Sequence, residues 1–398
     1  MKVLYILHQY FPYFYTGTEL LTDNLGRYNR DLGVETAVWA YKPSNDVATD
    51  DLERINYRGM PVTFFSHHNG DSQRDRKLYW ENGTKNERLE KLILETKPNI
   101  VHVTHSSRMG DIIKTINDLK IPYVLTLTDY WLLCPTATLL RKNGELCGGS
   151  NFDPKCLHYC FKNNEKLRQE RWNAVNDLLN NATTIAYAAN FLKKMFQKNG
   201  VDTTKWQKIR HGYNTSGERY RVVDRNYRFA FTGTLQPSKG GHLVIKAFRR
   251  IKNPAARLVI FGDKKHDPIY SKYCLDLASG DKRVEFRGKY DHTKLVSEFK
   301  DIDSIIVPSN WFEPFPFTLI NAVTYGFDVI GANIGGIPEI IGINNQDSLF
   351  EPGDSDDLMN KMLIKLKNGK NKKAKIFYEQ SVESEAFEYF KVYKRALI

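Results

Sequence analysis

The sequence predicts an α/β protein with two doubly wound domains, each built on its own parallel sheet. Three observations lead to this fold class: the length of 398 residues, the alternation of apolar strand-like runs with helical stretches, and a restart of that alternation midway along the chain. A chain of this length exceeds what one hydrophobic core usually organises, so two domains are expected. The 41% of hydrophobic residues and 13% of aromatic residues are typical of a folded globular protein.

The first half of the chain contains six short apolar runs that we interpret as strands. Continuous runs rich in β-branched and aromatic residues are typical of strands buried on both faces of a parallel sheet. The runs are residues 3–7, 36–40, 62–65, 100–103, 123–127 and 184–187. Six strands suit one Rossmann-like domain, which we place at residues 1–212.

A polar, turn-rich segment at residues 211–226 has the composition of an interdomain linker, and we expect a cleft beside it. The strand pattern then begins again. The second set of runs is 228–231, 257–261, 284–286, 304–307 and 328–331. We assign residues 213–377 to a second Rossmann-like domain. Residues 378–398 show helical spacing without a further strand, which predicts a terminal helix that packs back on the first domain.

The charge of the chain indicates an anionic partner. The net charge is +12, which suits a nucleotide, a nucleic acid or an acidic membrane surface. No basic tail or arm carries this charge, so we expect no nucleic acid. The N-terminal run MKVLYIL is too short for a signal-peptide core, and no run approaches the roughly 18–20 apolar residues of a membrane span. We therefore expect a cytoplasmic protein that is soluble or peripheral at the inner face of the membrane.

Two turns between a strand and a helix carry residues suited to phosphate. Gly17 and Thr18 follow the first strand, while Gly233, Thr234 and Lys239 follow the first strand of the second domain. Backbone N–H groups at a helix start attract phosphate, and a lysine there neutralises a diphosphate. Taken alone, the turn at Gly17 is equally consistent with a flexible loop. A lone lysine such as Lys239 is more often a solvated loop residue. The GxGxxG spacing of dinucleotide dehydrogenases is absent from both turns, which disfavours that class.

Residues 303–341 add a carboxylate to this picture. Glu313 lies in a loop ahead of a helix that starts near Phe317, and the N–H groups of residues 317–319 would point at a phosphate. A carboxylate so close to a diphosphate would repel it unless a sugar stood between them. We therefore assign Glu313 to the sugar hydroxyl groups.

Residues 303–341 resemble the signature of the retaining glycosyltransferases of family 4, which have the GT-B fold. The resemblance rests on Glu313, the turn Gly335-Gly336-Ile337-Pro338-Glu339, the loop 233–240 and the strand that ends at Gly262, and it extends over essentially the entire chain. It implies a hexosyltransferase of polysaccharide biosynthesis that moves a sugar from a nucleotide-diphosphate sugar to a glycan, lipid-linked or other acceptor. It also implies catalysis without a metal cofactor.

The resemblance implies a role for each matching residue. Lys239 would hold the donor diphosphate, Glu313 the sugar, and Gly17 the phosphates from the other domain, while the base would lie against residues 287–290. The donor-binding residues expected in this way are Gly17, Thr18, Gly233, Thr234, Lys239, Gly262, Arg287, Lys289, Glu313, Phe315, Pro316, Phe317, Thr318, Leu319 and Asn321. The expected catalytic residues are Glu313, Lys239 and Asp129, and His105 is a further candidate for lining the pocket.

The sequence departs from the family pattern at three positions. Asn321 replaces the glutamate that holds the ribose, Thr234 replaces an arginine partner of the lysine, and Thr128 replaces a histidine after the fifth strand of the first domain. Asn can still bind a diol, whereas Thr cannot carry a proton as an imidazole does. Two alternatives therefore stay open: a catalytically silent carbohydrate- or nucleotide-binding partner of an active glycosyltransferase, and a GT-B-like sugar-nucleotide epimerase.

Two further features have competing interpretations. Cys134, Cys147, Cys156 and Cys160 fall within 27 residues, a set that could form a structural zinc site or remain as free thiols. Residues 71–92 mix basic and aromatic side chains with acidic ones. That segment is either a contact surface for a lipid-linked acceptor at the membrane or an ordinary solvated face.

Overall fold

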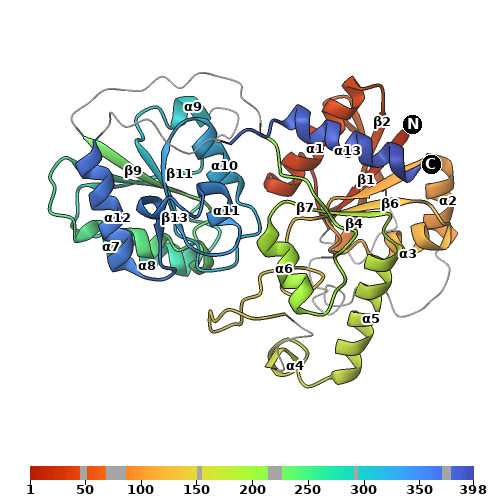
Figure 1. The fold of residues 1–398 in the computed structure, drawn as a ribbon, viewed down its shortest axis with the longest axis horizontal. Helices are drawn as coiled ribbons and strands as arrows, with labels where there is room; N and C mark the ends of the chain where they lie inside the picture. Colours follow the sequence, from red (N-terminus) through yellow and green to blue (C-terminus); the bar gives the residue numbers. More distant parts are fainter. Residues whose placement is uncertain (45–51, 69–86, 150–154, 214–225, 291–294, 370–377) are drawn as a thin grey trace. The chain divides into compact units, whose positions relative to one another are not determined.

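The computed structural model describes residues 1–44, 52–68, 87–149, 155–213, 226–290, 295–369 and 378–398 and forms two compact units (Figure 1). Unit 1 consists of Met1–Gly212 together with Gln380–Ile398. Unit 2 consists of Tyr213–Glu379. Within each unit a parallel sheet is accompanied by helices, so the predicted α/β class with two parallel-sheet domains is confirmed.

Unit 1 contains an eight-stranded sheet in the order β3-β4-β2-β1-β5-β6-β7-β8. Its strands are β1 Lys2–Leu7, β2 Glu35–Ser44, β3 Leu52–Tyr57, β4 Met60–His68, β5 Ile100–Val103, β6 Tyr123–Leu127, β7 Thr184–Tyr187 and β8 Gln207–Lys208. All pairings are parallel except that of β3 with β4. The strands β1, β5 and β6 are almost entirely buried, as the apolar runs predicted. Two strands, β3 and β8, were not predicted.

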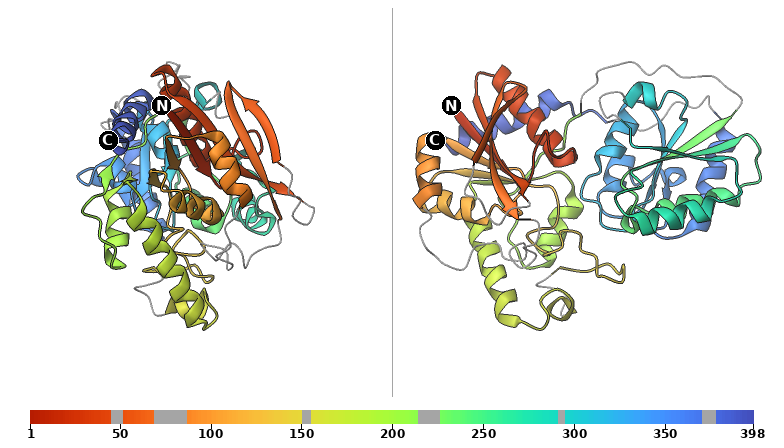
Figure 2. Two further views of the ribbon diagram at one scale, coloured as in Figure 1. Left: turned by 90° about the vertical axis from the view of Figure 1, so that its right-hand side faces the viewer. Right: turned by 180° about the vertical axis from the view of Figure 1, so that it is seen from behind.

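The helices of unit 1 lie on both sides of its strands (Figure 2). They are α1 Gly17–Asp31, α2 Glu87–Thr96, α3 Gly110–Asp118, α4 Lys155–Tyr159, α5 Glu165–Asn181, α6 Asn190–Lys198 and α13 Val382–Ala396. Among the described residues, no helix is long and apolar enough to cross a bilayer.

The last helix, α13, is fastened to unit 1 through buried polar contacts. His102 on β5 places Nδ1 2.7 Å from the Tyr393 hydroxyl and Nε2 2.7 Å from Thr126 Oγ1. Glu385 places one carboxylate oxygen 3.0 Å from His211 Nδ1 and accepts the Gly212 N–H on the other at 2.7 Å. Because buried polar groups are costly unless they are paired, this network fixes α13 in one position on the sheet.

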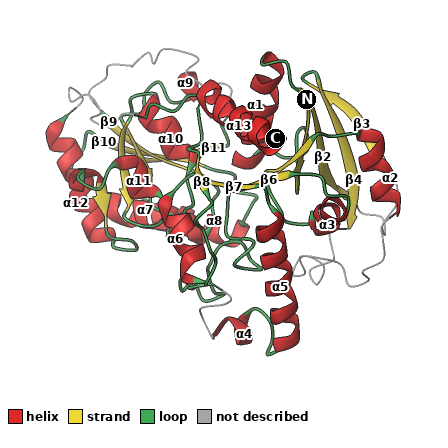
Figure 3. Cartoon of the chain, turned by 45° about the vertical axis from the view of Figure 1, so that its right-hand side comes forward, coloured by secondary structure: helices red, strands yellow, loops and turns green. Residues whose placement is uncertain are grey.

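Unit 2 contains a six-stranded parallel sheet in the order β11-β10-β9-β12-β13-β14 (Figure 3). Its strands are β9 Tyr227–Thr232, β10 Ala256–Phe261, β11 Val284–Gly288, β12 Ser304–Val307, β13 Asp328–Ala332 and β14 Leu349–Phe350. Its helices are α7 Gly241–Arg249, α8 Pro268–Ala278, α9 Leu295–Glu298, α10 Phe317–Thr324, α11 Ile337–Ile341 and α12 Ser355–Asn368.

The strand order gives each sheet one switch point, where the chain changes from one side of its first strand to the other. In unit 1 this point lies between β1 and β5, and in unit 2 it lies between β9 and β12. Loops that leave the carboxyl ends of such neighbouring strands diverge and leave room for a ligand. We call the carboxyl ends of the strands at each switch point the edge of that unit. Functional side chains are therefore expected at these two edges.

Candidate functional site

The edge of unit 2 is built from the loops after β9 and β12, which are in direct contact. Gly240, at φ +72°, ends the short helical turn Pro237–Lys239 and begins α7. A Cβ at Gly240 would collide with the carbonyl oxygen of Pro308, and the Asn310 N–H donates to the Ser238 carbonyl at 2.8 Å. Only a glycine permits both the left-handed backbone and this close approach.

Lys239 and Glu313 form an ion pair at this edge. The distance between Lys239 Nζ and Glu313 Oε1 is 2.6 Å. The same Oε1 accepts hydrogen bonds from Ser309 Oγ and Trp311 Nε1, both at 2.8 Å. The ammonium also lies 4.9 Å from the centroid of the Trp311 indole ring, a cation–π distance. The sequence predicted a role for each of the two charges, and the structure brings them into contact.

The two oxygens of the Glu313 carboxylate have different surroundings. All three of its hydrogen bonds go to Oε1, and Oε2 has no hydrogen-bond partner among the described residues. The side chain is only 6% exposed, whereas that of Lys239 is 26% exposed. Oε1 therefore fixes the carboxylate in place, and Oε2 is left to accept a hydrogen bond from a ligand.

The turn at Gly335 and Gly336 holds the backbone of Glu313. The Gly336 N–H donates to the Glu313 carbonyl at 2.7 Å. Gly335 has φ +61°, and a Cβ there would collide with the Glu313 backbone. The glycine pair in the signature thus has a physical reason, because it lets one loop pack against the backbone of the loop that carries the carboxylate.

Helix α10 begins beside this ion pair, with Pro316 at its N-cap. The Leu319 N–H donates to the Pro316 carbonyl at 3.0 Å, and Leu319 is fully buried. The Leu319 N–H is therefore already engaged in the first helical turn, and its role at a phosphate stays a prediction. Phe317 and Thr318 are half-buried, whereas Phe315 is buried beside Tyr378 with the ring centroids 6.2 Å apart.

The other residues expected at the donor in unit 2 fall into two groups. Gly233 and Gly262 bring the loops after β9 and β10 together, since a Cβ at Gly262 would lie 2.6 Å from the Gly233 carbonyl oxygen. Arg287 pairs with Asp301 and Glu285, and Lys289 Nζ lies 2.9 Å from Asp263. The bonds to Asp301 raise the pKa of Arg287. Both basic side chains thus already have carboxylate partners.

Two positions that depart from the family pattern lie near these loops. Thr234 and Asn321 are both half-buried, and Asn321 lies on α10. The Asn321 side chain has no hydrogen-bond partner among the described residues. Its amide is therefore available to a ligand.

In unit 1, the start of α1 is closed by its own side chains. Thr16 is the N-cap, and its N–H donates to the Glu19 carboxylate at 2.7 Å in a capping box. Gly17 and Thr18 form the first turn, and the Thr18 carbonyl accepts from Thr22 Oγ1 at 2.9 Å. Both residues are half-buried at the edge that includes the switch point.

The same edge of unit 1 gathers two histidines and an aspartate. His8 directly follows β1, His105 follows β5 and Asp129 follows β6. His105 Nε2 lies 2.8 Å from Asp129 Oδ2, and the rings of His8 and His105 lie 3.9 Å apart between centroids. The sequence predicted Asp129 and His105 as pocket residues but missed His8. The signal was present, because a polar residue that ends a buried first strand lies at the ligand edge of a doubly wound sheet.

The cysteine segment gives no support to the zinc interpretation. All five cysteines are free, and Cys134, Cys147 and Cys156 are buried. Hydrogen bonds with the Cys147 and Cys160 thiols, together with burial, raise the pKa of Cys156. Within the described ranges, no group of three or more His, Cys, Asp and Glu side chains could hold a metal ion. Most of the basic and aromatic segment 71–92 lies outside the described residues.

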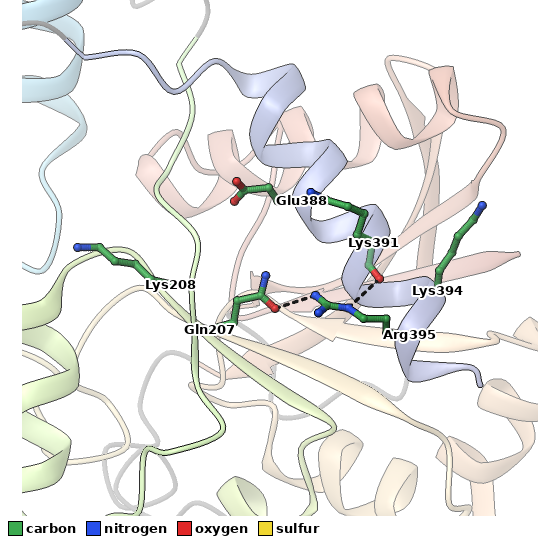
Figure 4. A pocket seen from close by; sticks show the side chains of 6 residues that line it. All are labelled: Gln207, Lys208, Glu388, Lys391, Lys394 and Arg395. Carbon is green, nitrogen blue, oxygen red and sulfur yellow. Dashed lines mark hydrogen bonds between the residues drawn. The ribbon is translucent and has the colours of Figure 1, made fainter.

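Unit 1 also has a surface hollow of about 520 Å³ between β8 and α13. It is lined by Gln207, Lys208, Glu388, Lys391, Lys394 and Arg395 (Figure 4). Arg395 donates to Gln207 Oε1 at 3.0 Å, while the Lys208 and Lys394 side chains extend in opposite directions. Because these charges do not converge, we do not count the hollow as part of the functional site.

Residues 216–382 match the sequence profile of the family described as glycosyl transferases group 1. This segment, less than half of the chain, is similar to the group 1 glycosyl transferases. The matched segment includes Lys239, Glu313 and the Gly335-Gly336 turn. The match thus agrees with the part of the resemblance that rested on these motifs.

Curated relatives match a little over a third of the chain. A glycogen synthase of Mycobacterium tuberculosis (strain CDC 1551 / Oshkosh) is 27% identical over 154 residues, which are 37% of this chain and 34% of the relative. The putative glycosyltransferase YtcC of Bacillus subtilis (strain 168) is 30% identical over 153 residues, which are 35% of each protein. The chain thus spans about a third of the length of the curated relatives that it matches.

Solved structures resemble the chain over its whole length. Sucrose-phosphate synthase from Thermosynechococcus elongatus has a TM-score of 0.68 at 15% identity. The aligned residues are 99% of this chain and 98% of the synthase chain. Anabaena Alr3699/HepE in complex with UDP and glucose has a TM-score of 0.66 at 16% identity, with 100% and 95% covered. At this identity the likeness shows the fold, which is GT-B.

Proposed function

We propose that this protein is a retaining glycosyltransferase of group 1 that moves a hexosyl group from a nucleotide-diphosphate sugar to a hydroxyl group of a glycan or lipid-linked acceptor. The observation that carries the proposal is the Lys239–Glu313 pair at the switch point of unit 2, at 2.6 Å. The pair provides a cation that can neutralise a diphosphate and a fixed carboxylate that can accept hydrogen bonds from sugar hydroxyl groups. The proposal keeps the cytoplasmic location expected from the sequence.

The two charges have different tasks in the proposed reaction. The Lys239 ammonium has three N–H donors and shares one with Glu313, so it can donate to a diphosphate oxygen without leaving the carboxylate. As the bond between the sugar and the phosphate breaks, negative charge grows on the diphosphate, and a positioned cation stabilises it. The start of α10 adds a positive partial charge on the same side.

Glu313 would orient the sugar rather than attack it. Its Oε2 accepts hydrogen bonds from sugar hydroxyl groups, while three donors to Oε1 prevent the carboxylate from turning. The acceptor oxygen then bonds to the anomeric carbon, the diphosphate leaves, and the acceptor proton passes to a diphosphate oxygen. The protein supplies orientation and electrostatic stabilisation in this mechanism, and no metal is required.

The first experiment identifies the donor. We would screen UDP-glucose, UDP-galactose, UDP-N-acetylglucosamine, ADP-glucose and GDP-mannose by thermal shift, because a ligand at 100 times its Kd stabilises the fold by about 2.7 kcal/mol. UDP and ADP donors come first, since HepE was solved with UDP and starch synthase IV of Arabidopsis thaliana with ADP. A panel without any shift would contradict the proposal.

The second experiment tests turnover with the donor that binds. We expect Lys239→Ala and Glu313→Ala to abolish release of the nucleoside diphosphate, while Lys272→Ala, on the exposed face of α8, retains it. Retention would appear in the proton NMR spectrum as an unchanged anomeric configuration in the product. Binding without turnover in the wild-type protein would instead indicate the catalytically silent partner.

A further inference from the structure

The switch point of unit 1 holds an imidazole, that of His8, whose ring nitrogens have no hydrogen-bond partner among the described residues. Side chains from the ends of three neighbouring strands meet there: His8 after β1, His105 after β5 and Asp129 after β6. Two of these groups have their bonding atoms engaged with each other and with the backbone, and the third does not. The difference between them points to a ligand.

His105 has both of its ring nitrogens in use. Its Nδ1 accepts the Ser107 N–H at 3.1 Å, which assigns the ring proton to Nε2, and Nε2 donates to Asp129 Oδ2 at 2.8 Å. The other Asp129 oxygen accepts the Trp131 N–H at 2.8 Å. His105 is therefore a fixed wall of the site, because it has no nitrogen left for a substrate.

His8 lies against this wall with its ring nitrogens unpaired. The His8 and His105 ring centroids are 3.9 Å apart with an interplanar angle of 39°. His8 Nδ1 is buried without a hydrogen-bond partner, and Nε2 is neither enclosed in this way nor bonded to another described residue. A buried nitrogen without a hydrogen-bond partner destabilises the fold by about 1–3 kcal/mol. A hydrogen bond to a bound hydroxyl group would remove this cost.

The charge state of His8 suits a neutral ligand. Burial, together with the nearby His105 and Arg108, holds the pKa of His8 well below its usual range. The ring is therefore neutral at physiological pH, with one nitrogen that donates and one that accepts. A neutral imidazole can bind an alcohol through either nitrogen.

The position at which the family pattern has a histidine is occupied here by a residue that faces the sheet. Thr128 Oγ1 donates to the Thr104 carbonyl at 3.3 Å, so its hydroxyl is already used inside unit 1. His8 reaches the same sheet edge from β1, which lies next to β5. The edge thus contains an imidazole that can face a ligand, supplied by a different strand.

We propose that His8 binds the acceptor hydroxyl group of a sugar or polyol, with His105 and Asp129 holding its ring in place. This role rests on the proposed transferase function. In the reaction His8 accepts a hydrogen bond from the hydroxyl group, whose oxygen forms the new bond to the anomeric carbon. The bond from that carbon to the diphosphate breaks, and the proton ends on a diphosphate oxygen.

The test separates acceptor binding from donor binding. Wild-type protein, His8→Ala and His8→Gln would be compared with the control His158→Gln, which changes an exposed histidine of α4. Calorimetry with UDP or ADP gives nucleotide affinity, and release of the nucleoside diphosphate from the donor found in the panel is measured with glucose, galactose, mannose, glycerol or water as acceptor. Melting curves show whether each variant is folded.

For His8→Ala we expect nucleotide affinity within about 2-fold of wild type and a loss of roughly 10- to 100-fold in kcat/KM for the acceptor, the range of one lost hydrogen bond. His8→Gln, whose amide reaches the Nε2 position, should recover part of that loss. A folded His8→Ala with the wild-type KM for the acceptor overturns the inference, as does an equal loss of nucleotide affinity. A wild-type protein without any turnover overturns the transferase function itself.

Discussion

The two sheet edges of this protein have the same topology and opposite chemistry. In each unit the switch point lies between two neighbouring strands whose loops diverge. These strands are β1 and β5 in unit 1 and β9 and β12 in unit 2. The edge of unit 2 carries the Lys239–Glu313 ion pair. The edge of unit 1 carries two imidazoles, one of them bonded to Asp129.

This difference indicates that the strand topology determines where on each unit a ligand binds. The side chains at that place determine which chemical group of the ligand is bound. An ammonium beside a helix start suits a diphosphate, whereas an uncharged imidazole suits a hydroxyl group. The glycines show the same division. Gly240 and Gly335 in unit 2 press loop backbones together around the ion pair, while α1 in unit 1 is closed by a Thr16–Glu19 capping box.

The largest effect is expected when the charge of Glu313 is removed but its shape is kept. Glu313→Gln should lower donor turnover by roughly 10²- to 10³-fold, the range for loss of one positioned polar group. Nucleotide affinity should stay equal or rise, because the Lys239 ammonium no longer shares its charge with a carboxylate 2.6 Å away. Calorimetry and steady-state kinetics measure the two quantities. A parallel fall in both would mean that Glu313 only supports the fold.

The second prediction concerns the turn behind Glu313. Gly335→Ala should destabilise the protein by about 3 kcal/mol, because the left-handed backbone and a collision with the Glu313 backbone both oppose a side chain. Gly326→Ala is the matched control, since Gly326 also has φ +70° but an added Cβ meets nothing within 4 Å. It should cost only about 1–2 kcal/mol. Urea unfolding measures both, and equal losses would remove the packing role assigned to Gly335.

The third prediction uses pH to separate the units. Burial lowers the pKa of His102 to about 3, so the unfolded chain takes up this proton first, near pH 6.5. Stability is therefore fully present above pH 6.5 and falls by about 1.4 kcal/mol per pH unit below it. In unit 2, the Arg287 hydrogen bonds lower the pKa of Asp301, a contribution that is lost only below pH 3.8. The half-buried His242 adds a smaller decline there, since burial lowers its pKa.

Hydrogen exchange corrected for intrinsic rates, at pH 7.5 and 5.0, reports each unit separately. Unit 1 should lose protection more steeply than unit 2. His102→Gln cannot take up a proton in this range, so it should make the dependence in unit 1 less steep and leave the contribution of His8. An equal decline in both units would show that the buried histidine of β5 does not control it.

The smallest effect is expected at Asn321, where the sequence departs from the family pattern. Asn321→Glu should tighten nucleotide binding by about 3- to 10-fold, because hydrogen bonds to a charged group are stronger than those of an amide. Asn321→Ala is the control and should weaken binding slightly. Titration calorimetry with UDP or ADP measures both. If the glutamate weakens binding, repulsion from the diphosphate outweighs its bond to the ribose.

The sequence predicted the fold class because nearly every buried parallel strand is a continuous apolar run. The strands that it missed lack this signal. The residues of β3, LERINY, are exposed or half-buried, and β3 is an outermost strand of its sheet. The strands β8 and β14 have only two residues each. Their pairing depends on neighbouring strands, which a pattern within one segment does not contain.

The candidate site was predicted in part for a similar reason. Lys239 and Glu313 were identified from their own loops, but their contact joins residues 74 positions apart and arises only in the folded unit. Arg287 and Leu319 stay predicted donor-binding residues, and the sequence did not indicate their bonds within unit 2, to Asp301 and to Pro316. His8 was missed because, in the sequence, it only ended an apolar run.

The attachment of α13 to unit 1 has a consequence for biosynthesis. Translation completes all of residues 213–379 before the residues that carry Glu385, Tyr389 and Tyr393 leave the ribosome. Domains generally fold in the order in which they are synthesised. In this protein the sheet of unit 1 is synthesised first, but His102 and His211 lack their partners on α13 until residues 382–396 have also been synthesised.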